Sequence, residues 1–180
     1  MKGTLLIRTA VAATATAAVL SGTALPAAGA SNDAAQARQA TAAYQDSSVI
    51  TGDAAWGQLY DRDGITCIDN PAGGMGIHFV NPARIGDAQE TASAPEAVIY
   101  EPQANGDLRL VALEYVVTKQ AWEEAGHTAP PRLFEQDFEL VRAGNRYGLP
   151  DFYELHAWIW RHNPTGMNED WNPRVSCSRG

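Results

Sequence analysis

Residues 151–173, DFYELHAWIWRHNPTGMNEDWNP, contain a mostly apolar run whose side chains alternate between two faces and which is long enough to cross a small sheet. With a period of two, one face of an extended segment carries Phe152, Glu154, His156, Trp158 and Trp160, and the other carries Tyr153, Leu155, Ala157 and Ile159. Both faces are mostly apolar, so the pattern predicts a central strand over 152–161 that is covered on both sides. A histidine and a glutamate inside such a strand need hydrogen-bond partners or a functional role.

Shorter extended segments precede this strand and are separated by glycine, proline and asparagine. A turn at 70–74 leads into a strand over 75–80, and strands over 97–101 and 108–117 form a hairpin around Asn105-Gly106-Asp107. Residues 138–141 form a second hairpin with the long strand, because the segment between them is rich in turn residues. The sheet is therefore expected to be antiparallel.

The helical signals lie mainly before the strands. An alanine-rich run begins after Asn32 or Asp33, either of which could be its N-cap, and its thin apolar stripe suits a helix that lies on a sheet. A second short helix is expected from Asp53, and a third over 120–125 with Thr118 as its cap. This order predicts an α+β domain: an N-terminal helix packed on a curved antiparallel β-sheet or partly closed barrel. A pocket could lie on the concave face of that sheet.

The first thirty residues have the pattern of a signal peptide. Lys2 and Arg8 precede an apolar run that ends in Ala28-Gly29-Ala30, which matches an A-x-A cleavage site. A membrane anchor is the alternative, but threonine, serine and glycine interrupt the run before it reaches the roughly 20 apolar residues that a span needs. We therefore expect cleavage after Ala30, a secreted protein without an integral membrane segment, and a single domain over 31–180.

The charge of the chain argues against two classes of partner. The formal net charge is −8, and removal of Lys2 and Arg8 makes it −10. The arginines are scattered and Lys119 is the one lysine outside the signal segment, so the sequence offers no basic patch for nucleic acid or an anionic membrane surface.

Cys67 and Cys177 are the two cysteines of the chain. An exported protein with an even number of cysteines commonly pairs them, so we expect a disulfide that ties the C-terminus to the start of the sheet. A thiolate metal site or a reactive thiol is the alternative, but neither cysteine has a CxxC or Cys-His neighbour.

Three ionisable residues fall on apolar faces of predicted strands. Glu114 shares its face with Leu108, Leu110, Ala112 and Val116, while His78 lies with Val80 and His156 lies with the tryptophans. Glu154, two residues before His156, is a further candidate ligand-binding residue. If these faces look into one cavity, His78, Glu114, Glu154 and His156 would line it.

The chemistry of these residues leaves three interpretations open. Two histidines and a carboxylate, His78, Glu114 and His156, are a ligand set for a divalent metal such as zinc or iron. Without a metal, a glutamate and a histidine in a dry pocket could act as general acid and base. Alternatively, all three are core polar residues that are satisfied by neighbouring side chains or backbone. The sequence contains no HExxH, GxSxG or CxxC motif, which disfavours zincins, α/β-hydrolases and thioredoxin-like proteins.

Three sequence blocks also carry a resemblance. GGMGIHFVNP at 73–82, YELHAWIWRHNPTGM at 153–167 and WNPRVSC at 171–177 resemble a family of small exported bacterial proteins of unknown function. The similarity extends over most of the chain from the alanine-rich helix onward. It implies export and a single domain, and it implies no site residue, cofactor or partner.

These observations support three functional hypotheses. The first is a secreted protein that binds a small molecule or a metal ion in a sheet-lined pocket. The second is a metal-dependent or Glu/His acid-base enzyme, which needs an accessible cavity beside the cluster. The third is a structural or interaction protein of the cell envelope, which predicts an exposed apolar patch around Trp171 and residues 163–173.

Overall fold

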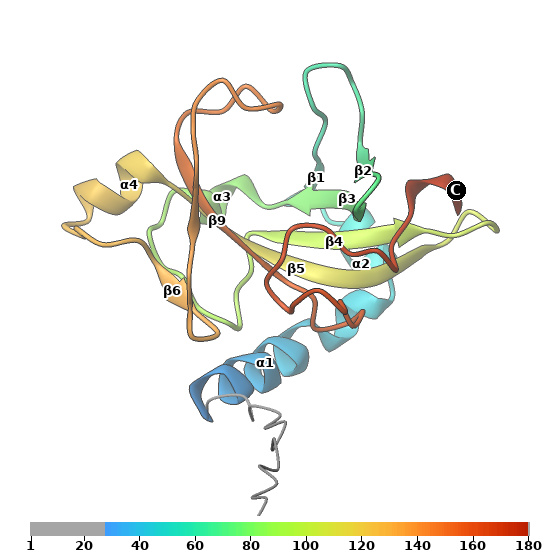
Figure 1. Cartoon of the computed structure of the whole chain (residues 1–180), viewed down its shortest axis with the longest axis horizontal. Helices are drawn as coiled ribbons and strands as arrows, with labels where there is room; N and C mark the ends of the chain where they lie inside the picture. The colour runs from blue at the N-terminus through green and yellow to red at the C-terminus, as the bar shows by residue number, and fades with distance from the viewer. Residues whose placement is uncertain (1–27, 180) are drawn as a thin grey trace, which may run out of the picture.

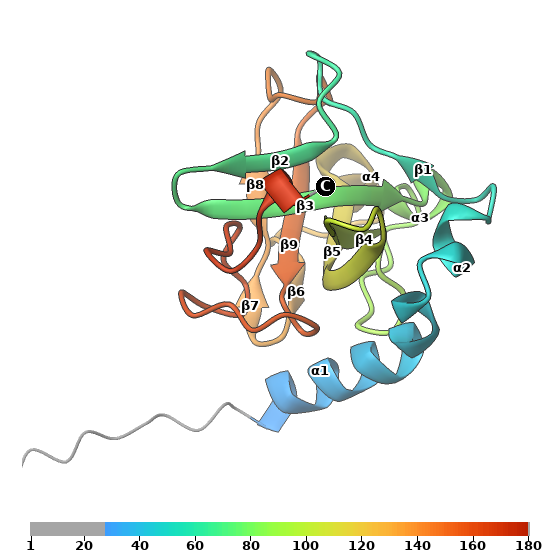
Figure 2. The ribbon, with the colours of Figure 1, turned by 90° about the vertical axis from the view of Figure 1, so that its right-hand side faces the viewer.

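The computed structural model describes residues 28–179. The expected signal peptide, residues 1–30, lies outside this part except for its last three positions, so its cleavage stays a prediction. Within the described part the protein is α+β, with a helix before a largely antiparallel sheet, as the sequence predicts. Helix α1 lies below the sheet in both views, and the loops between β1 and β2 and between β8 and β9 rise on the other side (Figures 1 and 2).

Seven strands form the main sheet, and every neighbouring pair is antiparallel. In spatial order they are β1 (Gly57–Gln58), β3 (Gly73–Val80), β4 (Ala97–Pro102), β5 (Leu108–Thr118), β9 (Phe152–Ala157) and β8 (Glu139–Val141), and β2 (Cys67–Asn70) also pairs with β3. A separate hairpin consists of β6 (Arg132–Leu133) and β7 (Gln136–Asp137). Among the described strands no pairing joins β1 to β8, so the sheet does not close into a barrel.

The remaining elements are helical and mostly short. They are α1 (Ala28–Thr41), η1 (Ala42–Gln45), α2 (Ser48–Thr51), α3 (Pro82–Ile85), α4 (Lys119–Glu124) and η2 (Cys177–Arg179). The cap of α4 is confirmed, because Thr118 Oγ1 accepts a hydrogen bond from the Ala121 amide. The N-cap expected for the first helix is wrong: α1 begins at Ala28, and the Asp33 carboxylate accepts from the Phe134 amide instead.

The short helix expected from Asp53 is also absent. The Asp53 carboxylate accepts a hydrogen bond from the Ala55 amide, 2.9 Å away, and so closes a turn. The chain then leaves this turn in extended form and pairs with β3 as β1. Local side-chain bonding of the aspartate therefore overrides the helical spacing of the apolar residues.

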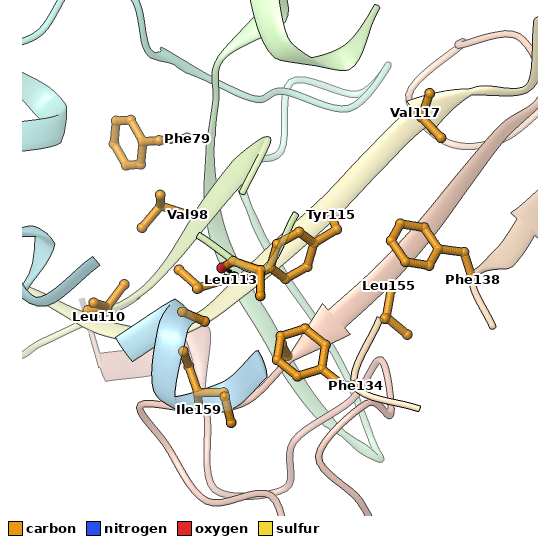
Figure 3. Close-up of a cluster of buried hydrophobic side chains, with 14 of the residues drawn as sticks. Phe79, Val98, Leu110, Leu113, Tyr115, Val117, Phe134, Phe138, Leu155 and Ile159 are labelled. Atoms are coloured by element: carbon orange, nitrogen blue, oxygen red, sulfur yellow. Dashed lines mark hydrogen bonds between the residues drawn. The ribbon is translucent and has the colours of Figure 1, made fainter. Parts of the chain in front are cut away.

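The hydrophobic core lies between α1 and the sheet. Ala34 and Ala37 of α1 pack against side chains from β3, β4, β5 and β9, together with Phe134 and Phe138 from the region of β6 and β7 (Figure 3). The helix therefore covers one sheet face, as its thin apolar stripe predicts. Side chains that alternate with this core point to the opposite face of the sheet, which holds the candidate site.

A bulge in β5 changes one predicted face. Between β4 and β5 the register shifts so that Val111 is an extra residue on β5. Leu110 consequently packs in the α1 core, whereas Ala112 belongs to a smaller cluster on the opposite face. The expectation that Leu110 shares the face of Glu114 is therefore wrong, because the extra residue inverts the alternation N-terminal to it.

The long strand is shorter than predicted. β9 ends at Ala157, where the Ile159 amide donates to the Ala157 carbonyl and the chain turns. The Trp160 indole then donates to Thr41 Oγ1 at the end of α1, 3.1 Å away. Trp160 therefore lies on the helix side of the sheet and not on the side of His156, as the alternation had predicted.

The predicted disulfide is confirmed. Cys67 and Cys177 are bonded, with a Cα–Cα distance of 5.6 Å and a sequence separation of 110. Backbone hydrogen bonds between Gly74 and Asn172 hold the same C-terminal segment against β3. At Gly73 an added Cβ would lie 2.3 Å from the Asn172 carbonyl oxygen, so this approach of two backbones requires glycine.

Candidate metal centre

The three predicted metal ligands converge on one face of the sheet. His78 lies on β3, Glu114 on β5 and His156 on β9, and Glu114 is directly opposite His156 across the β5–β9 ladder. His78 reaches this pair from across β4, where its register partner is Ile99. One ligand atom from each of the three side chains lies within 4.8 Å of the others, and all three side chains are buried.

The spacing of these atoms is wider than in a hydrogen-bonded cluster. His78 Nε2 lies 3.6 Å from Glu114 Oε2, and His156 Nε2 lies 4.0 Å from Glu114 Oε1. Hydrogen bonds between such groups are about 2.7–3.2 Å long. In a tetrahedral zinc site with bonds of about 2.0–2.1 Å, neighbouring ligand atoms are about 3.4 Å apart. The three side chains therefore need only a small contraction to meet one ion.

The ring nitrogens that face the cluster lack partners. Among the described residues, His78 Nε2 and both nitrogens of His156 are buried without a hydrogen bond. An unsatisfied buried polar atom costs about 1–3 kcal/mol, and buried polar side chains are normally paired. Imidazole nitrogens without hydrogen bonds that converge on a carboxylate are a donor set that suits a divalent cation.

Burial and charge act in opposite directions on the two histidines. Burial lowers the pKa of His78 to about 4, although Glu114 opposes the shift, so the ring is neutral at pH 7. Burial also lowers the pKa of His156, but the carboxylates of Glu114 and Asp170 outweigh it and raise that pKa to about 9. His78 therefore offers a free lone pair, and a cation at the cluster would replace the proton of His156.

Glu154 lies beside the cluster on β9 and does not belong to the same ligand group. Burial and the neighbouring charge of Glu114 raise the pKa of Glu154 to about 9. Its carboxyl group forms a second set of possible metal ligands with His156 and Asp170, whose ligand atoms also lie within 4.8 Å of one another. His156 Nδ1 is 3.5 Å from Asp170 Oδ1, and the imidazole holds the pKa of Asp170 below its ordinary value.

A cavity of about 240 Å³ opens beside this second set. Its lining includes Glu154, Leu155 and His156 from β9 and residues 168–171 of the C-terminal segment. None of its described lining residues is lysine or arginine. Five carboxylate side chains line it: Asp137, Glu139, Glu154, Glu169 and Asp170. The cavity reaches His156, whereas His78 and Glu114 are enclosed.

Two loops cover the cluster on the side away from α1. Arg146, in the loop between β8 and β9, pairs with Asp61 at 2.8 Å, and its carbonyl accepts from the Arg62 amide. The pKa of the adjacent Tyr147 is raised mainly by burial, and the charges of Glu114 and Glu154 raise it further. The pairing thus closes the loops over the enclosed side of the site.

Sequence reasoning missed Asp170, Asp61 and Arg146. Asp170 lies in a tail without periodicity, which is held by a hydrogen bond from Asn168 to the His156 carbonyl, by one from the Trp158 indole to the Glu169 carbonyl, and by the backbone bridge between Gly74 and Asn172. Asp61 begins a turn over residues 61–64, DRDG, in which the Gly64 amide donates to the Asp61 carbonyl. No local signal connects it with Arg146, 85 positions later.

Comparison with known proteins adds no identification: no family model, curated protein or solved structure matches the chain. The resemblance to small exported proteins therefore stays a prediction. Within residues 28–179, no helix has the length and apolar character to cross a bilayer.

Proposed function

We propose that the protein is a secreted metal-binding protein that holds a divalent cation, zinc or iron, between His78, Glu114 and His156. The observation that carries this proposal is the set of buried, unpartnered imidazole nitrogens around a buried carboxylate. Two imidazoles and one carboxylate are a donor set for zinc and for non-haem iron, and they leave a fourth position for water or another ligand. The disulfide and the absence of a membrane-spanning helix among the described residues are consistent with export.

An ion at this position would change the energetics of the sheet. Glu114 is a buried acid with a neutral His78 on one side, and a divalent cation would compensate its charge directly. Since a ligand that binds only the folded state stabilises it, zinc should raise the unfolding temperature. Zinc is the first choice because both histidines and the carboxylate suit a tetrahedral ion that undergoes no redox change.

The test is metal analysis of protein secreted without an affinity tag, followed by zinc titration against a competing chelator. We expect bound zinc in the wild type. His78→Gln should lower the zinc affinity by more than about 100-fold, because loss of a ligand costs more affinity than loss of a residue that supports a ligand, which costs about 10- to 100-fold. His127→Gln is the matched control, since His127 is exposed and stacks on Trp122 away from the site. Equal zinc affinity in His78→Gln and the control would refute the proposal.

The second candidate is a metal-independent acid-base enzyme, and the cavity beside Glu154 and His156 favours it. Glu154, with its raised pKa, would be the proton donor at neutral pH, and the protonated His156 beside it would stabilise the carboxylate that forms. Activity that persists in excess chelator and disappears in Glu154→Gln would favour this candidate over the metal site.

The third hypothesis, a structural or interaction protein of the cell envelope, has less support from the exposed side chains. Trp171 is half-buried and lines the cavity, and the large exposed hydrophobic side chains lie outside residues 163–173: Val49, Tyr60, Ile65 and Leu149. The apolar patch expected around Trp171 is not present in that segment.

A further inference from the structure

The imidazole of His156 lies between two groups of possible ligands. On one side His156 Nε2 faces Glu114 at 4.0 Å, and His78 completes the enclosed group. On the other side Nδ1 faces Asp170 at 3.5 Å, and Glu154 completes a second group. His156 is 1% exposed, and neither of its ring nitrogens has a hydrogen-bond partner. One ring therefore has two unsatisfied nitrogens, each aimed at a carboxylate.

A single ion at the enclosed group would satisfy only one of these nitrogens. The simplest role for Asp170 would then be to accept a hydrogen bond from Nδ1 and orient the ring, as carboxylates commonly do behind a metal-bound histidine. That role needs a separation of about 2.7–3.2 Å, and the observed 3.5 Å is longer. This orienting role for Asp170 also leaves Glu154 without a function, although ligand atoms of Glu154, His156 and Asp170 lie within 4.8 Å of one another.

We propose that Glu154, His156 and Asp170 form a second divalent-cation site, so that His156 bridges two ions, one through each ring nitrogen. This inference rests on the proposed function, because the first ion occupies His78, Glu114 and His156. When both nitrogens bind an ion, the remaining ring proton of His156 and the carboxyl proton of Glu154 pass to solvent. Three carboxylates and one imidazolate then carry four negative charges, which two divalent cations neutralise. Neutralisation matters because buried charges without compensation are costly.

The two sites differ in access. The enclosed site is bounded by His78 and Glu114, neither of which lines the cavity. The outer site opens to the cavity of about 240 Å³, which has room for water molecules or a small oxygen-donor ligand. Three protein ligands leave open positions on a divalent ion. The outer ion is therefore the one that would meet solvent or substrate, and the enclosed ion would mainly hold β3, β5 and β9 together.

The test is zinc stoichiometry by equilibrium dialysis and elemental analysis on the full secreted chain. The wild type should bind two zinc ions. Asp170→Asn and Glu154→Gln should each bind one, and His78→Gln should also lose one. Asp137→Asn is the matched control, because Asp137 lines the same cavity but does not belong to the ligand group, and it should bind two.

A second measurement covers variants that fail to fold. With copper(II) as the probe, two ions joined through one imidazole should show magnetic coupling in the electron paramagnetic resonance spectrum of the wild type. Uncoupled copper signals would overturn the bridge. Loss of an ion in Asp137→Asn as well as in Asp170→Asn would overturn the outer site as a defined ligand set.

The stoichiometry also separates failure of this inference from failure of the proposed function. One zinc ion that is lost in His78→Gln but retained in Asp170→Asn would overturn the second site and leave the first intact. No zinc in the wild type would overturn both.

Discussion

Arg146 forms a 2.8 Å ion pair with Asp61, whose side chain is 3% exposed, and so joins two loops that are 85 positions apart in the chain. The Asp61 carboxylate also accepts hydrogen bonds from the amides of Asp63 and Ile65. Burial, and after it the charges of Glu114 and Glu154, raise the pKa of Tyr147, which follows Arg146, so we expect this pair to hold the loop between β8 and β9 near the enclosed site.

Arg146→Ala should therefore release zinc faster than the wild type. We expect an increase of about fivefold in the dissociation rate, which corresponds to about 1 kcal/mol, the upper range for a partly exposed pair. Transfer of zinc to a chromogenic chelator in stopped flow measures this rate. Arg142→Ala is the matched control, since its pair with Asp151 lies on the same loop at 3.4 Å and is exposed. An equal effect of both substitutions would contradict the covering role.

Stability should fall as the pH rises because of Glu96. Burial and the neighbouring Glu90 raise the pKa of Glu96 to about 9, and burial raises that of Glu90 to about 7, from an ordinary 4.5. A carboxyl whose pKa is raised by folding binds its proton more tightly in the folded state. The contribution of these two groups to the free energy of unfolding is therefore complete below pH 4.5. It is lost as the pH rises through about 7 for Glu90 and about 9 for Glu96.

Glu96→Gln should flatten this dependence. Its side-chain oxygen can still accept the 3.0 Å hydrogen bond from the Val116 amide, but it has no proton to lose. Urea unfolding at pH 5 and pH 9 should show a smaller decrease in unfolding free energy for the variant, by at least about 1 kcal/mol, the equivalent of less than one pKa unit. Parallel pH profiles would contradict this prediction.

Replacing both cysteines should destabilise the fold. The bond closes a loop of 110 positions, and removing a native disulfide from a small secreted domain costs about 2–5 kcal/mol. The double variant Cys67→Ser, Cys177→Ser should lose this amount in urea unfolding, and reductant should lower the wild type to the same value without affecting the variant. A loss below about 1 kcal/mol would indicate that the disulfide contributes little.

Glycine is required at position 76. Its φ is +95°, and an added Cβ would lie 2.7 Å from the Tyr100 carbonyl oxygen in the neighbouring strand. Gly76→Ala should therefore lower the free energy of unfolding by about 1–3 kcal/mol, through backbone strain and displacement of β4. Thermal unfolding measures the loss, with Gly86→Ala as the control because an added Cβ there meets nothing within 4 Å and its φ is negative. Equal unfolding temperatures in the two variants would contradict the requirement.

Much of the sheet follows from local signals in the sequence. Alternation and the turn at Asn105-Gly106-Asp107 predict the β4–β5 hairpin, and parity places Glu114 and His156 on faces where they meet across the ladder. Parity failed where the backbone left the regular strand. The extra residue Val111 inverts the face of Leu110, and the turn after Ala157 sends Trp160 to the helix side.

The rest of the site depends on contacts between distant parts of the chain. Asp170 reaches His156 because the tail is hydrogen-bonded to the end of β9 through Asn168 and Glu169 and to β3 through Asn172. No spacing within the tail encodes this position. A pattern along one strand predicts which face a side chain occupies, but the distance between side chains depends on strand order and on the segments that cover the sheet.

Anomalous diffraction from crystals grown with zinc, recorded at the zinc absorption edge, tests the metal centre most directly. We expect a peak within about 2.0–2.2 Å of His78 Nε2, His156 Nε2 and a Glu114 oxygen. A map without a peak between these three side chains, in crystals that contain zinc elsewhere, would contradict it.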